Sequence, residues 1–337
     1  MSEEENATFP AEGAVNGDKP PAIEVRNLFR SFGALKAVDG VSFSVDAGQV
    51  VGFVGANGAG KTTTMRIIAT LDYPNRGIVK VGGIDVVQYP AKVRSKIGWM
   101  PDHFGTYSNM TVIEYLDFFA RALGYKGQER AERVQDVMGF TDLTSLGDRL
   151  INKLSKGMGQ RLCLGRALIH DPEVLILDEP AAGLDPKARV ELKHLIRILA
   201  DEGKTVFISS HILSELGEMC DTLLFINNGQ IIKHGTAESL KHSAGGITVV
   251  NVNLAADIEK LEEWATMAPN VTFKEATKQG GRIEIDSIER DVVATVLKRM
   301  INDDLQVTEF HREERKLEDA FIEILGEIEA AGETTVK

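Results

Sequence analysis

The sequence predicts an α/β protein in which helices cover a largely parallel β-sheet. Apolar segments of strand length alternate with helix-forming stretches, an order typical of a parallel sheet with helical crossovers. The apolar segments, suited to strands buried on both faces, are 49–54, 173–177, 205–209 and 223–226. The helical stretches are 62–70, 158–170 and 187–201. A glycine-rich loop joins the first of these strands to the first of these helices. In α/β proteins such loops form phosphate sites.

Three parts of the chain differ in charge and composition. The 337 residues suggest about two domains. Residues 1–21 are polar, carry a net charge of −4 and predict a disordered acidic tail. Residues 22–245 carry a net charge of +1, and residues 246–337 carry −9. The overall charge of −12 argues against a nucleic-acid-binding protein.

The apolar segments and the cysteines bear on where the protein works. No run of about 18 apolar residues occurs, so we expect no direct membrane insertion. The N-terminus is acidic and lacks the apolar core of a signal peptide. Two cysteines, Cys163 and Cys220, do not make a disulfide framework and suit a reducing compartment. A cytoplasmic location follows, and any role at a membrane needs a partner protein.

Within residues 22–245 we expect two subdomains beside the parallel sheet. An antiparallel β subdomain is indicated by short strands at 23–25, 41–45 and 78–81, separated by glycine turns. A helical subdomain is expected at about 101–150, where residues 111–122 and 129–138 read as helices. The apolar side chains of the first helix recur at helical spacing, which is typical of core packing.

Residues 246–337 are expected to form a small α+β accessory domain. The predicted strands are 247–254, 271–275, 282–286 and 306–311, and the predicted helices are 256–267, 288–301 and 316–329. The first six of these elements follow the order βαββαβ, that of a split βαβ fold. Regulation, dimerisation and an inert role all remain open for this domain.

Residues 55–63 match the phosphate-loop pattern G-x-x-x-x-G-K-[ST]. The residues of this loop that we expect to bind nucleotide are Gly55, Asn57, Gly58, Ala59, Gly60, Lys61, Thr62 and Thr63. The glycines allow backbone N–H groups to approach polyphosphate closely. Lys61 is expected to contact the β- and γ-phosphates, and the hydroxyl of Thr62 to bind Mg²⁺.

A pair of acids follows the apolar strand 174–177. Asp178 suits Mg²⁺ coordination, directly or through water, and Glu179 suits polarising a water for attack on the γ-phosphorus. An acidic pair at a strand end is weak evidence alone, but it gains weight from the upstream phosphate loop. The chain lacks the Asn-Lys-x-Asp motif that reads guanine, since the segment beginning at Asn152 has no such Asp. ATP is therefore favoured over GTP.

The segment Leu154-Ser155-Lys156-Gly157-Met158-Gly159-Gln160-Arg161 resembles the signature motif of the ABC ATPases. Other motifs of that family occur in the family's order. Phe32 resembles the aromatic residue that stacks on adenine, Asp185 closes a segment like the family's D-loop, and His211 resembles the switch histidine that contacts the γ-phosphate. The resemblance covers about residues 22–240 and implies an ATPase with a P-loop core.

The family's architecture implies a homodimer in which each ATP lies between two subunits. The phosphate loop of one subunit faces Ser155 and Gly157 of the other. Lys156 departs from the usual signature, and either adds positive charge near the phosphates or faces solvent. Asp102 stands where the family has a metal-sensing glutamine, so it serves either as a metal contact or as a turn residue.

The single cassette, Met158 and the segment 316–322 together resemble ATPase subunits of drug and polysaccharide exporters. This implies a separate multi-span permease and a peripheral position on the cytoplasmic face of the membrane. An aromatic loop at 103–107 beside the helical subdomain is either a permease-docking groove or core. The segment 316–322 also fits an amphipathic helix packed on the cassette. The alternatives are an ATP-gated regulatory or ribosome-associated protein without transport, and an importer ATPase.

Overall fold

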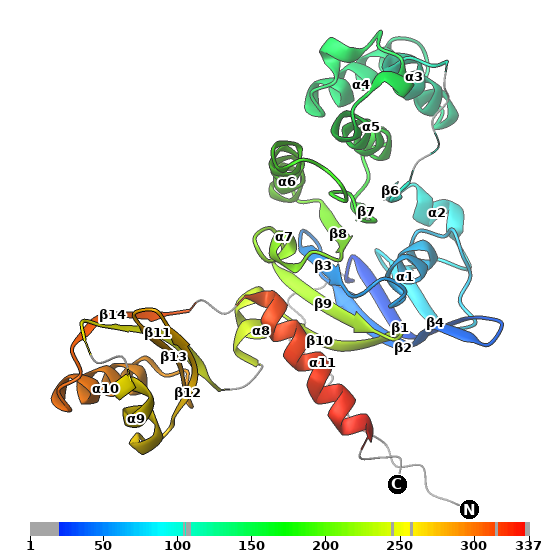
Figure 1. The fold of residues 1–337 in the computed structure, drawn as a ribbon. Coiled ribbons are helices and arrows are strands. Elements are labelled where there is room, and N and C mark those ends of the chain that lie inside the picture. Colours follow the sequence, from blue (N-terminus) through cyan, green and yellow to red (C-terminus); the bar gives the residue numbers. More distant parts are fainter. Residues whose placement is uncertain are drawn as a thin grey trace, which may run out of the picture.

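The computed structural model describes residues 20–103, 105, 109–243, 246–256, 259–313 and 316–333. Most of the predicted tail and three residues of the predicted aromatic loop, Phe104, Thr106 and Tyr107, lie outside the described residues. Figure 1 shows a large body built on two sheets and a smaller one built on a third. Within the described parts of the chain, no helix is both long and apolar enough to cross a bilayer.

The central sheet has six strands in the order β10-β9-β3-β8-β7-β6, and it confirms the predicted α/β class. Its strands are β3 (Val50–Val54), β6 (Ile97–Met100), β7 (Val174–Leu177), β8 (Thr205–Ser210), β9 (Thr222–Asn227) and β10 (Gln230–Gly235). All neighbouring strands pair in parallel except β9 with β10. Every residue of β3, β7 and β8 is buried, as their continuous apolar runs predict.

Helices lie around this sheet (Figure 1). They are α1 (Lys61–Ile68), α5 (Lys156–Leu168), α6 (Pro186–Asp201), α7 (Leu213–Gly217) and α8 (Ala237–Ser243). Ser155 caps α5 and Asp185 caps α6, each accepting a hydrogen bond from a backbone N–H three residues ahead. Of these helices, α1, α6 and α7 come after β3, β7 and β8, so the loops that lead into them lie at the carboxyl ends of parallel strands.

A second, antiparallel sheet has the order β2-β1-β4-β5 and matches the predicted β subdomain. Its elements are β1 (Ile23–Phe32), β2 (Leu35–Val45), β4 (Arg76–Val81) and β5 (Ile84–Asp85), and helix α2 (Pro90–Arg94) follows. Phe43 of this sheet stacks on Phe207 of the central sheet, with ring centroids 5.5 Å apart. The two sheets therefore share one apolar core.

A helical insert between β6 and α5 carries α3 (Val112–Ala122) and α4 (Gly127–Phe140), followed by the short turns η1 (Thr144–Leu146) and η2 (Ile151–Lys153). Thr111 and Glu114 form a capping box that starts α3. The predicted apolar stripe is buried at Val112, Tyr115, Leu116 and Ala120, and it joins the same core as α5. Most of this stripe thus packs internally.

The smaller body is a four-stranded sheet in the order β12-β13-β11-β14, with every pair antiparallel. Its elements are β11 (Thr248–Leu254), α9 (Glu259–Met267), β12 (Val271–Thr277), β13 (Gly280–Ile285), α10 (Arg290–Asn302) and β14 (Val307–Arg312). This confirms the predicted βαββαβ order. Its apolar core draws only on residues between Val250 and Phe310.

The last helix, α11 (Leu317–Glu333), leaves the smaller body and packs on the larger one beside α7 and α8 (Figure 1). Leu317, Ala320 and Ile324 are buried in the core that also holds α5 and α6. Phe321 meets Phe225 of β9 edge to face, with centroids 5.0 Å apart. The structure therefore shows an amphipathic helix packed on the cassette. The division of the chain at residue 245 stays a prediction.

Candidate functional site

The loop between β3 and α1 keeps its backbone in contact with neighbouring strands. Gly60 has φ 105°, and a Cβ there would lie 2.4 Å from the carbonyl oxygen of Ala37. A Cβ on Gly55 would lie 2.3 Å from the carbonyl oxygen of Ile226. Glycine is therefore required at both positions, at Gly60 for conformation and space, and at Gly55 for space alone. The loop can present its N–H groups to an anion at the start of α1.

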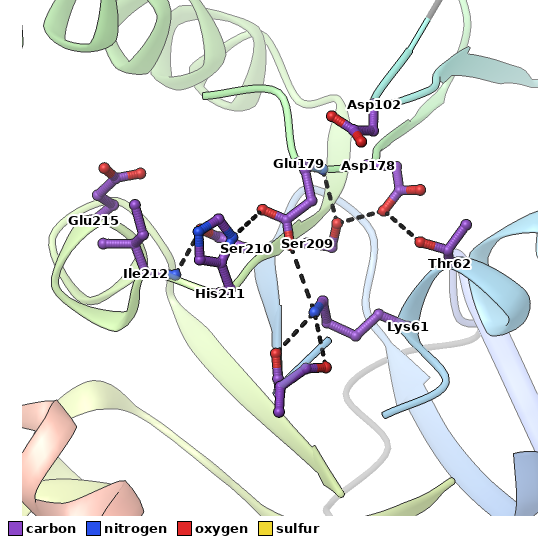
Figure 2. Close-up of polar contacts among 12 residues, drawn as sticks. Lys61, Thr62, Asp102, Asp178, Glu179, Ser209, Ser210, His211, Ile212 and Glu215 are labelled. Carbon is purple, nitrogen blue, oxygen red and sulfur yellow. Dashed lines mark hydrogen bonds and ion pairs between the residues drawn. The ribbon is translucent and has the colours of Figure 1, made fainter. Parts of the chain in front are cut away.

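Lys61 begins α1 and turns its side chain back under the loop. It is 6% exposed, and its Nζ donates to the carbonyl oxygens of Gly55 and Ala56 at 2.8 and 3.3 Å. The same Nζ lies 3.5 Å from Oε1 of Glu179 (Figure 2). A buried ammonium group is thus held beside the loop, where it can meet an anion as a localised charge.

Asp178 follows β7 and lies beneath the loop, 2% exposed. Its Oδ1 accepts hydrogen bonds from Thr62 Oγ1 at 3.2 Å and from Ser209 Oγ at 2.7 Å (Figure 2). Burial raises the pKa of this carboxyl group, the two hydrogen bonds lower it, and the nearby charges of Glu179 and Asp102 raise it further. The net pKa is raised, so a cation here would relieve the cost of the buried charge.

Glu179 occupies the next position in a left-handed conformation, φ 49°, which is uncommon for a residue with a side chain. Its backbone N–H donates to Ser209 Oγ at 2.9 Å. One carboxylate oxygen faces Lys61, and the other lies 2.8 Å from Nδ1 of His211. His211 directly follows β8, which pairs with β7. Glu179 and His211 therefore lie beyond the ends of neighbouring strands. The carboxylate has a fixed direction, as a general base needs.

A cavity of about 460 Å³ opens above these groups. It is lined by Phe32, Leu35, Ala37, Ala56, Asn57, Gly58, Gly60, Lys61, Thr62, Thr63, Asp102, Glu179, Ala182 and His211. Phe32, at the end of β1, is 48% exposed, and the guanidinium of Arg30 lies 4.5 Å from its ring centroid. One side of the cavity is thus aromatic, and another side is glycine-rich and carries the ammonium group of Lys61. This arrangement suits a nucleobase joined to phosphates.

Five predicted nucleotide contacts do not line this cavity, and three of them lie outside the phosphate loop. Ser155 is exposed, and its hydroxyl accepts from the N–H of Met158 at 3.4 Å. Gly157 faces α6, where a Cβ would lie 2.9 Å from Cβ of Ala188. Asp185 accepts from the N–H of Ala188 at 2.9 Å. Within one chain these residues act as helix caps and packing positions, and their role toward nucleotide stays a prediction.

The other two, Gly55 and Ala59, belong to the phosphate loop but do not line the cavity. Ala59 is buried, at 4% exposed, and Gly55 accepts from Lys61 through its carbonyl oxygen. Lys156 is exposed, yet its ammonium lies so close to Gly183 that a Cβ there would be 2.3 Å away. Lys156 therefore lies near the loop before α6, with its side chain exposed.

Sequence reasoning missed Ser209, which contacts both acids. Its only signal is a small hydroxyl residue near the end of a buried strand, two residues before His211. Leu35 and Ala37 were also missed, although both line the cavity and Ala37 lies against Gly60 of the loop. Both lie in β2, which reaches the cavity from the antiparallel sheet.

A strand, a glycine-rich loop and a helix that begins with Lys61, together with an acidic pair on a nearby strand, define a P-loop nucleoside triphosphatase. The sequence profile of the family described as ABC transporter matches residues 38–182. The chain is 40% identical over 210 residues to the ABC transporter ATP-binding protein NatA of Bacillus subtilis, covering 62% of this chain and 85% of that relative. The chain belongs to the ABC transporter family as an ATP-binding subunit, and it is an ATPase.

Two further relatives extend this finding. The Linearmycin resistance ATP-binding protein LnrL of Bacillus subtilis is 30% identical over 305 residues, covering 90% of this chain and 98% of that protein. The Nod factor export ATP-binding protein I of Burkholderia lata is 37% identical, covering 68% and 76%.

Solved structures give the same fold. One described as the ATP binding subunit of an ABC transporter superposes with a TM-score of 0.60 at 29% identity, covering 66% of this chain and 92% of that one. Another, described as the dimeric structure of MJ0796, a bacterial ABC transporter cassette, has a TM-score of 0.59 at 25% identity, covering 64% and 98%.

Proposed function

We propose that this chain is the ATP-hydrolysing subunit of an exporter, and that two copies close around two ATP molecules to drive a separate multi-span permease. The observation that carries the proposal is the placement of Glu179 between Lys61 and His211, directly beside the buried carboxylate of Asp178. These groups surround the cavity floor at the start of α1. Adenine stacks on Phe32 at the cavity wall, and the phosphates lie over the loop from Asn57 to Thr63.

The donor set fits Mg²⁺. Thr62 Oγ1 and Asp178 Oδ1 lie 3.2 Å apart, and the carboxylate of Asp102 faces the same cavity. Hydroxyl and carboxylate oxygens are the hard ligands that Mg²⁺ takes beside substrate phosphates. Burial raises the pKa of Asp178, so a cation bound there would relieve the cost of its buried charge. When bound, Mg²⁺ would be held by Thr62 and Asp178 and would neutralise phosphate charge.

Glu179 acts as the general base in this proposal. Its carboxylate accepts the proton of a water whose oxygen forms a new bond to the γ-phosphorus, while the bond from that phosphorus to the ADP oxygen breaks. Lys61 meets the negative charge of the transferred group. His211 holds the second oxygen of Glu179 and so orients the base. The products are ADP and inorganic phosphate.

In the proposed homodimer, the predicted contacts outside the phosphate loop would face the nucleotide of the partner subunit. Ser155 is an exposed helix cap at the N-terminus of α5, where a partner subunit's γ-phosphate would meet free N–H groups and a favourable dipole. Asp185 lies at the start of α6, next to the loop that Lys156 contacts. A similar cassette is described as dimeric.

The direction of transport is inferred from relatives. Their descriptions refer to Nod factor export and linearmycin resistance, and LnrL aligns with 90% of this chain, so the likeness extends into the C-terminal body. The helical insert carries α3 with Phe118 exposed, which gives the permease an apolar contact on the cytoplasmic face.

Dimer closure is tested with Glu179→Gln, which should bind ATP without completing hydrolysis. Analytical ultracentrifugation should show a shift to dimer with ATP and Mg²⁺, but not with ADP. Adding Ser155→Glu places a negative charge near the partner's phosphates and should abolish the shift. Ser145→Glu in the exposed turn η1 is the matched control. A monomer in every condition contradicts the proposed dimer.

Partner and direction need a second experiment. The chain is captured from its native membranes under mild detergent, and its partners are identified by mass spectrometry. A multi-span protein alone supports an exporter. Co-purification of a substrate-binding protein as well identifies an importer, and capture of ribosomal subunits identifies a regulatory protein.

A further inference from the structure

Ser209 lies near the end of β8 and is completely buried. Its hydroxyl donates to Oδ1 of Asp178 at 2.7 Å and accepts from the backbone N–H of Glu179 at 2.9 Å (Figure 2). A serine hydroxyl has one proton, so these two bonds set its orientation. One small side chain thus touches both acids of the proposed reaction.

One hydrogen bond of Ser209 constrains the side chain of Asp178, and the other constrains the backbone of Glu179. The bond to Asp178 leaves Oδ1 shared between Ser209 and Thr62, and the backbone N–H of Asp178 is held by the carbonyl oxygen of Met100 at 2.8 Å. The bond from Glu179 holds its backbone in a left-handed conformation, φ 49°. Such conformations persist only where surrounding groups hold them. Release of this backbone would let the Glu179 carboxylate turn away from Lys61 and His211.

We infer that Ser209 is a positioning residue, whose hydroxyl orients Asp178 toward Thr62 and holds the Glu179 backbone at the angle that directs its carboxylate into the cavity. The inference rests on the proposed roles of these two acids. Ser209 does not line the cavity, so it acts through Asp178 and Glu179 rather than on the substrate itself. Partners of this kind affect metal affinity or activity by about 10–100-fold when removed.

A merely structural role predicts a different result, and the same strand offers a control. Thr205, at the start of β8, is 2% exposed, and its hydroxyl accepts from the N–H of Gly48 at 2.9 Å. Like Ser209, Thr205 has a buried hydroxyl that accepts a hydrogen bond from a backbone N–H. It lies at the other end of β8, away from the site. Thr205→Val removes it without changing the shape of the side chain.

The test compares Ser209→Ala, Ser209→Thr and Thr205→Val in the full chain. A fluorescent ATP analogue is titrated with Mg²⁺ and again in EDTA, and kcat and KM are measured separately. We expect Ser209→Ala to weaken the Mg²⁺-dependent gain in affinity about 10-fold or more and to lower kcat by about 10–100-fold. Its affinity in EDTA should not change. Ser209→Thr keeps the hydroxyl and should retain most of the Mg²⁺-dependent gain, and Thr205→Val should lower only the Tm.

Three outcomes would overturn the inference. In the first, Ser209→Ala matches the wild type in both the Mg²⁺-dependent affinity and kcat. In the second, it weakens binding equally with and without Mg²⁺, which is the mark of general disorder. In the third, Ser209→Thr folds and loses as much as Ser209→Ala. A wild-type chain whose nucleotide affinity ignores Mg²⁺ would contradict the proposed metal site itself, so the two failures are distinguishable.

Discussion

The ammonium nitrogen of Lys61 lies 3.5 Å from Oε1 of Glu179, and both side chains are largely buried. The other oxygen of Glu179 contacts Nδ1 of His211 at 2.8 Å. One carboxylate therefore joins the start of α1 to the end of β8. Because both oxygens of Glu179 are in contact with a neighbour, its carboxylate has little rotational freedom. A general base needs such a fixed orientation toward the attacking water.

Glu179→Gln should lower kcat for ATP hydrolysis by about 10²–10⁴-fold, because the amide keeps the shape of the side chain but cannot accept a proton. Equilibrium ATP binding should remain, since Lys61 keeps its carbonyl partners in the loop. A phosphate-release assay and a binding titration measure the two effects separately. Glu129→Gln, on the exposed face of α4, is the control. Wild-type turnover in Glu179→Gln would contradict the role of this base.

Lys61→Ala should weaken ATP binding by about 10–100-fold, which corresponds to about 1.5–3 kcal/mol for a hydrogen bond to a charged group. The lost cation lies directly under the loop and is 6% exposed, so water would replace it poorly. Isothermal titration calorimetry with ATP gives the change in Kd. Lys274→Ala, in β12 of the smaller body, removes a charge paired with Glu284 and should leave the Kd unaltered. Unchanged affinity in Lys61→Ala would remove the phosphate-loop assignment.

The sequence predicted the local motifs of the site, but not the contacts that depend on which strands and helices pack together. The phosphate loop is a local motif, and Asp178 meets Thr62 because parallel strands place their carboxyl ends at one edge. Ser209 could not be predicted, since its contacts depend on the pairing of β7 with β8, in which Leu177 lies opposite Ile208. The burial of α11 was undecided, because an amphipathic pattern shows that a helix has a partner without showing which one.

Asp178→Asn should raise the stability of the protein in EDTA while it abolishes hydrolysis. The pKa of Asp178 is raised chiefly by burial, so the folded state binds this proton more tightly than the unfolded state, and the ionised carboxylate destabilises the fold at neutral pH. The amide keeps an oxygen for the hydroxyls of Thr62 and Ser209 and removes repulsion from Glu179. Each 1 kcal/mol gained should raise the Tm by about 2–4 °C in domains of 150–250 residues.

The gain should depend on pH in a definite direction. Above the raised pKa of the folded state, both states of the wild type are ionised at this position, so the destabilisation is complete. As the pH falls through the raised pKa of the folded state toward the ordinary aspartate pKa of 3.8, the folded wild type takes up the proton and the difference in Tm from Asp178→Asn should shrink. Thermal melts across this range measure it. A variant less stable than the wild type at pH 7 would show that the buried charge is already compensated.

Helix α11 packs on α7, the helix that follows His211. A single substitution at Leu317 should weaken this packing. Glu318 Oε1 accepts a hydrogen bond from the N–H of Ser214 in α7 at 2.8 Å. Leu317 of α11 packs against Gly217, which also belongs to α7. Leu317→Ala should reduce the free energy of unfolding by about 2–5 kcal/mol, because Leu317 is 4% exposed in the main core. Ile322→Ala, on the same helix but 68% exposed, should change stability by no more than about 0.5 kcal/mol. Urea unfolding curves compare the two variants, and equal losses would mean that α11 does not pack on the cassette in solution.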